Sequence, residues 1–511
     1  MSSLVYYKNK TSGITYVYEN TSTWNRDIKR CDTKRKCIGK LDPASGDIIP
    51  TGKRGLGNGD TAYAYVKCVG NSLILDKIAD ELSLTHTLKA AFPCEWDNIL
   101  TCAYYLISEG KALSHVETWS EQHAHPHGEA IPSQRVSELL KALTRSKQME
   151  FFTRWVKIRA KAGRSEYFAL DITSVSSYSE QNGYVRYGYN RDGENLPQIN
   201  LCLLLGGESG IPVYYESLNG RVKDVSTLEN VLRIMDWLGA KRYHTVMDRG
   251  FYSEQNIDGL YDRHIRFTVG VPFTPKWVRE LVNNVRGNIE DFSHYRRLGD
   301  YTVFTDTDTT AWKGHRCYRH IFYDSKKAAT EYANFLEKVD AWRVELESRP
   351  VEDNQPHYDR YFIVKETPKR GRRVEVRDEE TQAFKQNTAG FFVLISNDIK
   401  DPIQALKIYR CKDVVEKGFD NLKNALDMNR LRIHSAEAMQ GRLFIQFIAQ
   451  ILAAGVYKTL ATSKLDEKHT LPELMNELKS VHRVCLDGHR KPIFTKRSKV
   501  QTEILSAFGI K

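Results

Sequence analysis

Three acidic residues, Asp171, Asp248 and Glu416, lie in predicted strands and a predicted helix that could converge in an α/β fold. Apolar runs typical of β-strands carry both aspartates, and ligands of open α/β sheets tend to bind at the ends of strands. Mg²⁺ prefers carboxylate oxygens, phosphate oxygens and water as its ligands. Three converging acids therefore predict a pair of Mg²⁺ ions, which Mn²⁺ can replace, and the chemistry of such a pair is displacement at phosphorus.

The segment around Glu416 predicts a helix with a polar face. At 100° per residue, four polar positions fall within an arc of about 60°: Tyr409, Lys412, Glu416 and Lys423. The neighbouring face carries an apolar stripe, formed by Ile408, Val415, Phe419, Leu422 and Leu426. Such a stripe predicts packing on a sheet. An amphipathic helix with solvated charges has the same pattern, so the polar face indicates a metal and phosphate site only because two strand-borne aspartates accompany it.

The order of the three acids resembles the DDE triad of prokaryotic insertion-sequence transposases. The helix is similar to the signature Tyr-x-x-Arg-x-x-x-Glu-x-x-x-x-x-x-Lys of their cut-and-paste subgroup, except that Lys412 replaces Arg. Residues 187–200 and 247–253 are similar to what this subgroup carries around its first two acids. The resemblance covers residues 165–270 and 390–445 well, and the N-terminal and insertion regions more loosely.

The resemblance implies an enzyme that cleaves the ends of an insertion sequence and joins the freed 3′-hydroxyl to target DNA, through a hairpin or directly. Its partners would be double-stranded DNA, as terminal inverted repeats and as target, and a second copy of the chain in a homodimeric synaptic complex. The three acids would be the catalytic residues and the metal ligands. The residues expected to contact DNA phosphates beside a flipped base are Tyr409, Lys412, Lys423 and Arg249.

Two positions leave the expected DNA contacts open. Lys412 offers a point charge where arginine would offer a planar bidentate donor, and Arg410 does not substitute because it points about 100° away on the helix. Trp312 lies in the polar sequence Ala-Trp-Lys-Gly-His. Its indole could stack on an unpaired base or pack in the core.

Two other classes of protein fit the same residues. One is a DNA-binding protein that keeps the scaffold without catalysis, and a cleavage assay separates it from the enzyme. The other is a two-metal nuclease without strand transfer, which product analysis with a labelled 3′-hydroxyl end separates.

Composition favours a polyanionic partner. The 511 residues carry a formal net charge of +11 and are 41% hydrophobic, so the chain can build real cores while attracting nucleic acid. No run approaches eighteen apolar residues and the N-terminus lacks a signal-peptide pattern, which predicts a soluble cytoplasmic protein that is nucleoid-associated when bound to DNA and has no membrane partner. The nine cysteines are predicted to be reduced.

The elements that position the acids follow a recognisable order. Strands are predicted at 166–172, 198–206, 211–216, before Asp248, at 266–270 and at 391–395, with helices from 224 and near 254–262. We therefore expect an α/β fold: a ribonuclease-H-like mixed sheet with helices on both faces, interrupted by a mainly β insertion, plus N-terminal DNA-binding modules.

Six segments are predicted along the chain. They are a basic β-rich module (1–70), a helical DNA-end-binding domain (71–160), a first catalytic-core segment (161–271), a β-rich insertion domain (272–390), a second catalytic-core segment (391–463) and a C-terminal helical tail (464–511). Residues 1–55 carry eleven Lys and Arg against five Asp and Glu, which suits a DNA backbone or a solvated hairpin. The apolar run from 436 to 460 predicts a core helix.

Overall fold

The computed structural model describes residues 2–9, 13–25, 30–43, 46–49, 63–162, 167–179, 182–222, 224–239, 243–348, 356–367, 371–426, 428, 430–486 and 491–511. These residues form two compact units, 1–67 with 482–495, and 68–481 with 496–511. Residues 482–495 of the predicted tail thus belong with the N-terminal segment. Residues on both sides of the predicted boundaries at 160, 271, 390 and 463 lie in the same unit, so the six segments stay a prediction.

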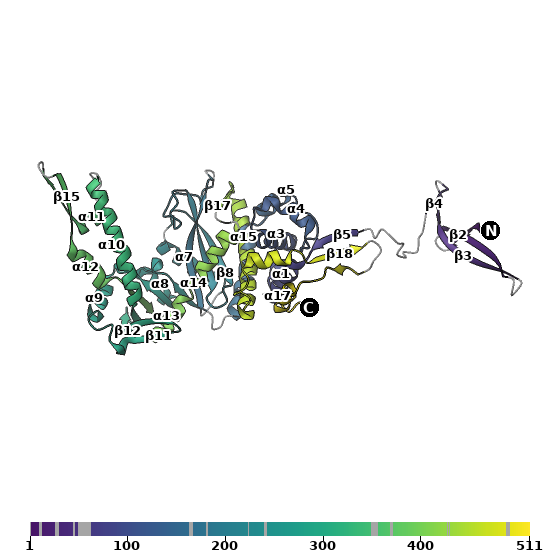
Figure 1. The fold of residues 1–511 in the computed structure, drawn as a ribbon. Coiled ribbons are helices and arrows are strands. Elements are labelled where there is room, and N and C mark those ends of the chain that lie inside the picture. The colour runs from purple at the N-terminus through teal and green to yellow at the C-terminus, as the bar shows by residue number, and fades with distance from the viewer. Residues whose placement is uncertain are drawn as a thin grey trace. The chain divides into compact units, whose positions relative to one another are not determined.

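The first unit consists of two small sheets (Figure 1). An antiparallel sheet contains β1 (Ser2–Lys8), β2 (Thr15–Asn25), β3 (Arg30–Leu41) and β4 (Ile48–Ile49). A second sheet contains β5 (Tyr63–Cys68), β18 (His482–Leu486) and β19 (Ile493–Phe494). The β-prone, polar alternation of the N-terminus therefore does form strands. The densest basic cluster of the predicted module is Lys29-Arg30 and Lys34-Arg35-Lys36. The side chains of its first three members lie outside the described residues, and those of Arg35 and Lys36 are exposed.

The second unit is built on a ten-stranded mixed sheet. Along the sheet the order is β11 (Tyr295–Leu298), β12 (Tyr301–Trp312), β13 (His315–Tyr323), β16 (Phe391–Ser396), β10 (Arg266–Val271), β9 (His244–Met247), β6 (Tyr167–Ser177), β7 (Gln198–Gly206) and β8 (Pro212–Asn219), and β17 (Arg430–Leu431) pairs with β6. The strands β6, β9 and β10 run parallel, whereas β7, β8 and β16 are antiparallel to their neighbours. The strands predicted around both aspartates are thereby confirmed.

Burial explains why these segments form the centre of the sheet. All nine residues of β7 are buried, and so are nine of the eleven residues of β6. A strand buried along its whole length requires cover on both faces of the sheet. Helices α7 (Asp224–Trp237) and α8 (Glu254–Asp262) supply the two connections between β8, β9 and β10, as their helical spacing predicts.

The insertion differs from the mainly β prediction. Its described residues include the helices α9 (Lys276–Val285), α10 (Ser325–Ser348), α11 (Pro356–Tyr361) and α12 (Asp378–Asn387), of which α10, with 24 residues, is the longest. Apolar residues at helical spacing, Phe335, Val339 and Leu346, explain α10, because they pack into a small core of their own. Its strands β11 to β13 extend the main sheet, whereas the hairpin β14 (Phe362–Thr367) and β15 (Gly371–Val376) forms a separate two-stranded sheet.

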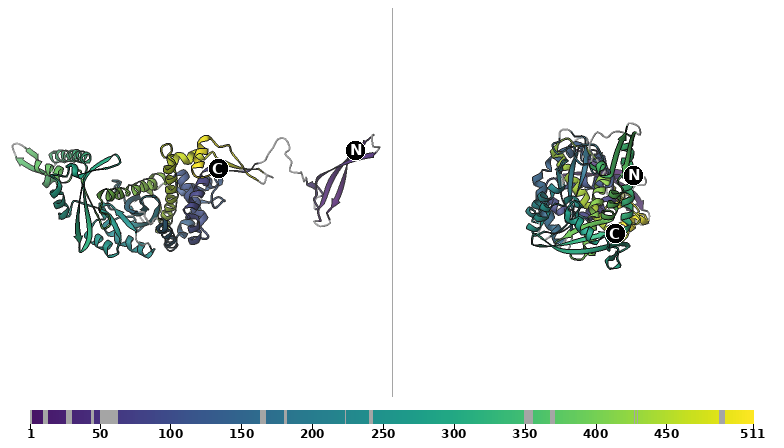
Figure 2. Two further views of the ribbon diagram at one scale, coloured as in Figure 1. Left: turned by 90° about the horizontal axis from the view of Figure 1, so that it is seen from below. Right: turned by 90° about the vertical axis from the view of Figure 1, so that its left-hand side faces the viewer.

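A helical bundle flanks the sheet. It contains α1 (Gly70–Glu81), α2 (Leu84–Ala91), α3 (Trp96–Glu109), α4 (Val116–Gln122), α5 (Ser133–Ala142) and α6 (Arg145–Ala162). The predicted core helix is α15 (Ala436–Ser463), which contacts α3, α5 and β8 and runs alongside the bundle in Figure 2. Among the described residues α15 is the one helix whose length and apolar composition would suffice to cross a membrane, and 78% of its most apolar window is buried inside the protein.

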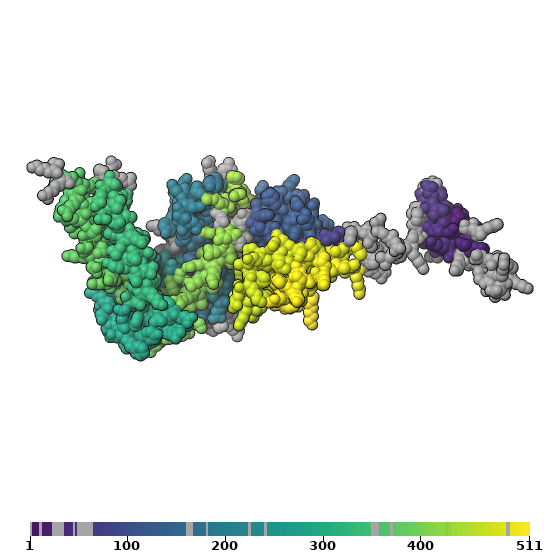
Figure 3. Space-filling view, in the orientation of Figure 1, coloured from purple at the N-terminus to yellow at the C-terminus, as the bar shows by residue number. Residues whose placement is uncertain are grey.

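The C-terminal helices complete this bundle. Helix α16 (Leu471–Leu478) contacts α1 and α3, and α17 (Lys499–Ala507) contacts α15 and α16. In the space-filling view the yellow C-terminal atoms adjoin the blue atoms of the bundle (Figure 3). Buried side chains of the bundle, of α15 and of the main sheet form one continuous apolar cluster. The bundle therefore supports the sheet that carries the acids.

Candidate active site

Strand register brings the first two acids together. Strands β6 and β9 are parallel, with Leu170 opposite Met247. The next residues along the two strands are Asp171 and Asp248, so the aspartates follow the last paired position on neighbouring strands. Because such strands lie about 4.8 Å apart, the two carboxylates reach one shared space at the end of β9.

The electrostatics of Asp171 fit a cation site. Burial raises the pKa of Asp171 to about 6, and the negative charge of Asp248 adds to the rise. The backbone N–H of Ile172, which donates to Oδ1 of Asp171 over 2.7 Å, and the charges of Arg191 and Lys412 oppose it. Two carboxylates that share a partly buried space and repel each other are suitable ligands for a hard divalent cation such as Mg²⁺.

Tyr409 reaches this pair because a glycine makes room for it. Its hydroxyl donates to Oδ1 of Asp248 over 2.8 Å. Val269 of β10 lies opposite Met247, which places Gly270 beside Asp248. A Cβ atom on Gly270 would lie 2.7 Å from the Tyr409 hydroxyl oxygen. We did not select Gly270 from the sequence, although a glycine inside a strand is the usual sign of a close approach.

The predicted single helix is interrupted. The segment contains α13 (Pro402–Arg410), α14 (Asp413–Asp420) and the π-helical turn η4 (Asn421–Ala425). Between α13 and α14 the backbone makes i to i+3 hydrogen bonds, such as Cys411 N–H to the Ile408 carbonyl, which tighten the turn, whereas the π turn widens it. The apolar stripe is confirmed as buried. Tyr409, Lys412 and Glu416 stay together, since the Lys412 ammonium lies 5.5 Å from the centre of the Tyr409 ring and 3.0 Å from Oε1 of Glu416. Lys423, which lies in the π turn, contacts Asp192 instead.

Lys412 connects the third acid to the first two. Its Nζ lies 3.0 Å from Oε1 of Glu416, and its side chain is 19% exposed whereas that of Glu416 is 58% exposed. Burial works against the charge on Lys412, but the carboxylates of Asp248, Glu416 and Asp171 outweigh it and raise the pKa of Lys412. The described part of the chain contains no group of three His, Cys, Asp or Glu side chains placed to hold a metal ion. The structure thus places Asp171 and Asp248 side by side, whereas Glu416 forms an ion pair with the Lys412 ammonium.

Three other predicted contacts lie in different surroundings. Arg249 directly follows Asp248 in the 3-10 turn η2 (Arg249–Phe251) and lines the cavity described below. Lys423 points elsewhere, since its Nζ is 2.6 and 2.8 Å from the two carboxylate oxygens of Asp192. Trp312 donates from Nε1 to Oδ1 of Asp258 over 2.8 Å and packs against the core. The half-buried indole thus packs against the core at one side, and its contact with a flipped base stays a prediction.

A cavity of about 1050 Å³ extends from Asp248 and Lys412 to the insertion helix α10. Its cationic side chains are Arg249, Lys327, Lys338, Arg410 and Lys412, and its aromatic ones include Phe273, Tyr301, Phe335, Trp342, Phe384, Phe391, Phe392 and Tyr409. The Arg410 guanidinium lies 3.7 Å from the centre of the Tyr301 ring, which agrees with its expected direction away from the polar face. Four carboxylates, Asp248, Asp324, Glu331 and Asp413, line the same cavity, so its five cations exceed its anions by only one. The aromatic rings beside these cations suit exposed bases of a polyanion.

Comparisons with known proteins agree with this chemistry at the level of the family. A cryo-EM structure of the piggyBac transposase synaptic complex with hairpin DNA is similar at 10% sequence identity and a TM-score of 0.38, over 80% of this chain and 77% of that chain. A likeness of this size does not establish a shared fold. No curated protein matches the chain. The family model described as transposase DDE domain matches residues 163–452, which include all three acids and more than half of the chain. The chain belongs to the DDE transposase family.

Proposed function

We propose that the protein is the transposase of a prokaryotic insertion sequence, of the cut-and-paste subgroup with the Tyr-Arg-Glu-Lys signature. It cleaves the ends of its element and joins the 3′-hydroxyl to target DNA. The observation that carries this proposal is the register of β6 and β9, which sets Asp171 beside Asp248. The signature is represented by Tyr409, Lys412, Glu416 and Lys423.

The fold supports the proposal. We assign the five strands in the order β8, β7, β6, β9 and β10 to a ribonuclease-H-like core, because β6, β9 and β10 are parallel and β7 and β8 are antiparallel to their neighbours. The N-terminal sheets and the helical bundle α1 to α6 are assigned as DNA-binding modules on the strength of their position in the chain and the basic N-terminus.

Two divalent ions, Mg²⁺ or Mn²⁺, fit the carboxylates of Asp171 and Asp248, with Glu416 as the third ligand. When bound, such ions supply Lewis acidity to the attacking and leaving oxygens of a displacement at phosphorus. Glu416 serves as a ligand only when its exposed carboxylate turns from the Lys412 ammonium toward the aspartates. Its 58% exposed side chain leaves room for that rotation.

The other residues of the site orient and bind. The Tyr409 hydroxyl fixes the direction of the Asp248 carboxylate through its hydrogen bond. Lys412 and Arg249 present positive charge to a DNA phosphate at the mouth of the cavity. One site can carry out nicking, hairpin formation and strand transfer, because each is the same phosphoryl transfer with a different nucleophile. The partners are then terminal inverted repeats, target DNA and a second copy in a synaptic dimer, in the cytoplasm on the nucleoid.

The test uses linear DNA that carries the inverted repeats flanking the coding sequence. Replacing Asp171, Asp248 or Glu416 by Ala should abolish Mg²⁺-dependent cleavage while end binding stays within threefold of the unchanged protein. Cleavage at the original rate in any of the three variants would remove that residue from the triad. Products that lack a new joint at a labelled 3′-hydroxyl would indicate a nuclease, and no cleavage by the unchanged protein would indicate a DNA-binding protein.

A further inference from the structure

A polar stripe on α15 faces the segment that carries Glu416 and Lys423. The stripe consists of Gln446, Gln450 and Tyr457, which fall within an arc of about 40° at 100° per residue. Gln446 is 0% exposed and Gln450 is 3% exposed. Two amides this deeply buried in a core helix need a reason, because apolar side chains of similar size would fill the same space without burying a polar group.

Both glutamines donate hydrogen bonds to backbone carbonyls of this segment. Nε2 of Gln450 donates to the carbonyl of Gly418 over 2.9 Å. Nε2 of Gln446 donates to the carbonyl of Leu426, also over 2.9 Å. Gly418 lies in α14 and Leu426 directly follows the π turn η4, so the two amides hold the chain on either side of that turn.

Tyr457 makes a third contact inside the turn. Its hydroxyl donates to Oδ1 of Asn421, the first residue of η4, over 2.9 Å. We refer to Gln446, Gln450 and Tyr457 together as the α15 brace. The brace contacts the chain before η4, in it and after it, so α15 holds both ends of the turn.

A glycine makes room for the brace. A Cβ atom on Gly418 would lie 3.0 Å from Nε2 of Gln450 and 3.0 Å from Cδ2 of Leu205 on β7. Glycine inside a helix is unfavourable relative to alanine, because it loses more backbone freedom on folding. The close approach of the Gln450 amide explains why α14 contains a glycine at this position.

Stability alone does not explain the two glutamines. Oε1 of Gln446 and Oε1 of Gln450 accept no hydrogen bond within the part of the chain that the structure describes. A buried oxygen without a partner lowers the free energy of unfolding. The Gly418 carbonyl also accepts from the backbone N–H of Asn421, so it would keep a partner without Gln450. Polar groups that reduce stability in this way are typical of a functional role.

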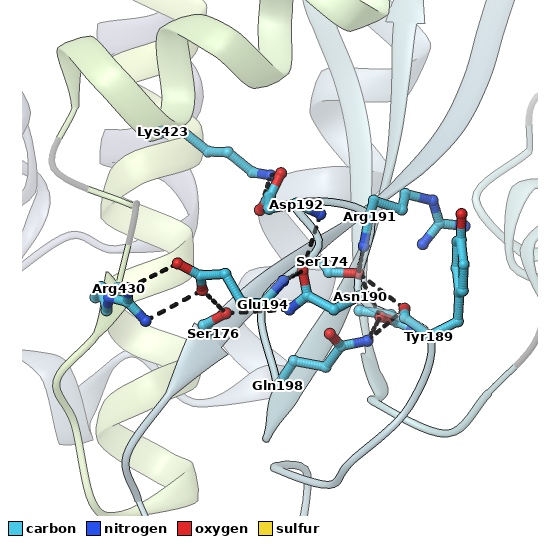
Figure 4. Close-up of polar contacts among 11 residues, drawn as sticks. Ser174, Ser176, Tyr189, Asn190, Arg191, Asp192, Glu194, Gln198, Lys423 and Arg430 are labelled. Carbon is cyan, nitrogen blue, oxygen red and sulfur yellow. Dashed lines mark hydrogen bonds and ion pairs between the residues drawn. The ribbon is translucent and has the colours of Figure 1, made fainter. Parts of the chain in front are cut away.

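The π turn sets the direction of Lys423. The backbone N–H of Leu426 donates to the carbonyl of Asn421, five residues earlier, whereas an α-helix uses the carbonyl four residues earlier. A change to α-helical hydrogen bonds would rotate the residues of the turn relative to Glu416, by up to about 100°. With the π turn in place, the Lys423 ammonium reaches the loop between β6 and β7 and contacts Asp192 (Figure 4).

We infer that the α15 brace is a set of positioning residues, which hold η4 in its π form and thereby set the Lys423 side chain relative to Glu416. The inference rests on the proposed function, in which Glu416 is a metal ligand and a DNA phosphate replaces Asp192 as the partner of Lys423. Helix α15 also contacts α3 and α5. The brace therefore connects the helical bundle to the segment that carries the third acid.

Replacing Gln450 separates positioning from stability. Gln450→Met keeps the length of the side chain and removes both the donor and the unpaired oxygen. We expect the melting temperature to stay the same or rise, while the rate constant of end cleavage falls about tenfold. Single-turnover cleavage with saturating protein measures that rate constant, because a misfolded fraction lowers only the amplitude. An unchanged rate constant would overturn the inference.

Gln440 provides a matched control on the same helix. Its Nε2 donates to the hydroxyl of Ser217 on β8 over 2.7 Å, rather than to the acidic segment. Gln440→Met removes an equivalent hydrogen bond, and we expect the rate constant to stay within about twofold of the unchanged protein. A fall of about tenfold in this variant as well would be a general effect of losing an α15 amide, and the specific role of Gln450 would be wrong.

A double-mutant cycle tests whether Tyr457 acts through Asn421. Tyr457→Phe and Asn421→Ala should each lower the rate constant about threefold, and the double variant should lose no more than either single variant. Losses that multiply to about ninefold would mean that the two side chains act independently, which contradicts their place in one brace.

Hydrogen exchange of the protein without DNA separates failure of this inference from failure of the proposed function. The backbone N–H groups of Leu426 and Met428, which donate to carbonyls five residues earlier, should exchange faster in Gln450→Met than in Gln440→Met. If exchange behaves in this way but the unchanged protein cleaves no DNA, the proposed function fails while the brace stands. If the unchanged protein cleaves DNA and the two variants exchange alike, the brace is wrong.

Discussion

Backbone pairing holds Asp171 and Asp248, whereas side-chain contacts hold Glu416 and Lys423. The aspartates directly follow the last register pair of β6 and β9, Leu170 with Met247, and a rotamer change cannot alter that register. Glu416 and Lys423 end on flexible chains whose places depend on Lys412 and Asp192. Backbone pairing thus arranges the strand half of the site, Asp171 and Asp248, whereas ion pairs arrange the helix half, Lys412, Glu416 and Lys423. In the function we propose, a metal ion or a phosphate would have to replace those ion pairs.

This difference teaches that sequence spacing fixes a site only as far as the backbone is regular. A parallel pair of strands has one register, so two acids at strand ends meet. A helix that passes into a π turn loses its 100° increments, so the spacing of the signature still groups Tyr409, Lys412 and Glu416 but does not place Lys423 with them.

The largest effect on end cleavage should come from a side chain that displaces Tyr409 from Asp248. Gly270→Ala places a methyl group 2.7 Å from the Tyr409 hydroxyl oxygen and 3.1 Å from the backbone nitrogen of Arg249. Tyr409 must therefore move away from Asp248. We expect end cleavage to fall about 100-fold, the typical cost of a displacement of about 1 Å in an active site. Single-turnover cleavage at saturating DNA measures it.

Two controls accompany this variant: the same substitution at Gly287, and Gly270→Ala combined with Tyr409→Phe. Gly287→Ala should have no effect, because nothing lies within 4 Å of its added carbon. In a Tyr409→Phe protein, Gly270→Ala should cost less than threefold, since the hydroxyl is gone. If end cleavage again falls about 100-fold when Gly270→Ala is added to Tyr409→Phe, contact with the backbone nitrogen of Arg249 is the cause. The arrangement of Asp171 and Asp248 then depends less on Tyr409 than we propose.

Removing the negative charge of Asp171 should stabilise the folded protein in the absence of metal ions. The pKa of Asp171 is about 6 in the fold against an ordinary 3.8, so the folded state holds its proton more tightly than the unfolded state does. This contribution favours folding below pH 4 and is lost as the pH rises from about 4 to about 6. Asp171→Asn should therefore raise the free energy of unfolding in EDTA by about 3 kcal/mol at pH 7.5.

Urea unfolding at a series of pH values measures this difference. It should shrink toward zero as the pH approaches 4 and stay constant above about 7. Saturating Mg²⁺ should reverse the order, because only the unchanged protein offers the carboxylate. A variant that is less stable than the unchanged protein at pH 7.5 in EDTA would show that the Asp171 carboxylate is not strained by its surroundings.

The smallest effect should come from Lys412 in the helix half, and it concerns the affinity for a divalent ion. Lys412→Met removes the ammonium that occupies the carboxylates, so Mn²⁺ should bind the DNA-free protein about fivefold more tightly, an effect of roughly 1 kcal/mol. Titration calorimetry with Mn²⁺ measures it, and the exposed Lys407 provides a matched Lys→Met control on the same segment. Weaker Mn²⁺ binding in Lys412→Met would contradict the idea that Lys412 competes with the metal.

The sequence predicted what local pattern determines. Apolar runs placed the strands that carry Asp171 and Asp248 and the buried stripe through Val415 and Phe419, since burial needs only the correct period. The break after Arg410 escaped prediction, because i to i+3 and i to i+4 hydrogen bonds suit the same residues.

Long-range partners were also out of reach of sequence reasoning. The pair of Lys423 and Asp192 joins positions 231 residues apart, and no local signal links them. Trp312 has polar neighbours in sequence, but a strand alternates its side chains, so the indole faces the core while those neighbours do not. In the insertion, the charged sequence near 325–347 predicts the helix that forms α10, but α9, α11 and α12 escaped prediction. The pairing of β13 with β16 escaped as well, because it is set by the whole sheet.

Strand β16 is hydrogen-bonded on both sides, to β10 of the core and to β13 of the insertion. The insertion is therefore not an accessory that can be trimmed to make a smaller enzyme. Cutting out 272–390 would leave a bare row of amide and carbonyl groups along an apolar strand, which is a template for aggregation. Any engineered minimal version of this protein has to keep β13, or cap the edge that its loss would create.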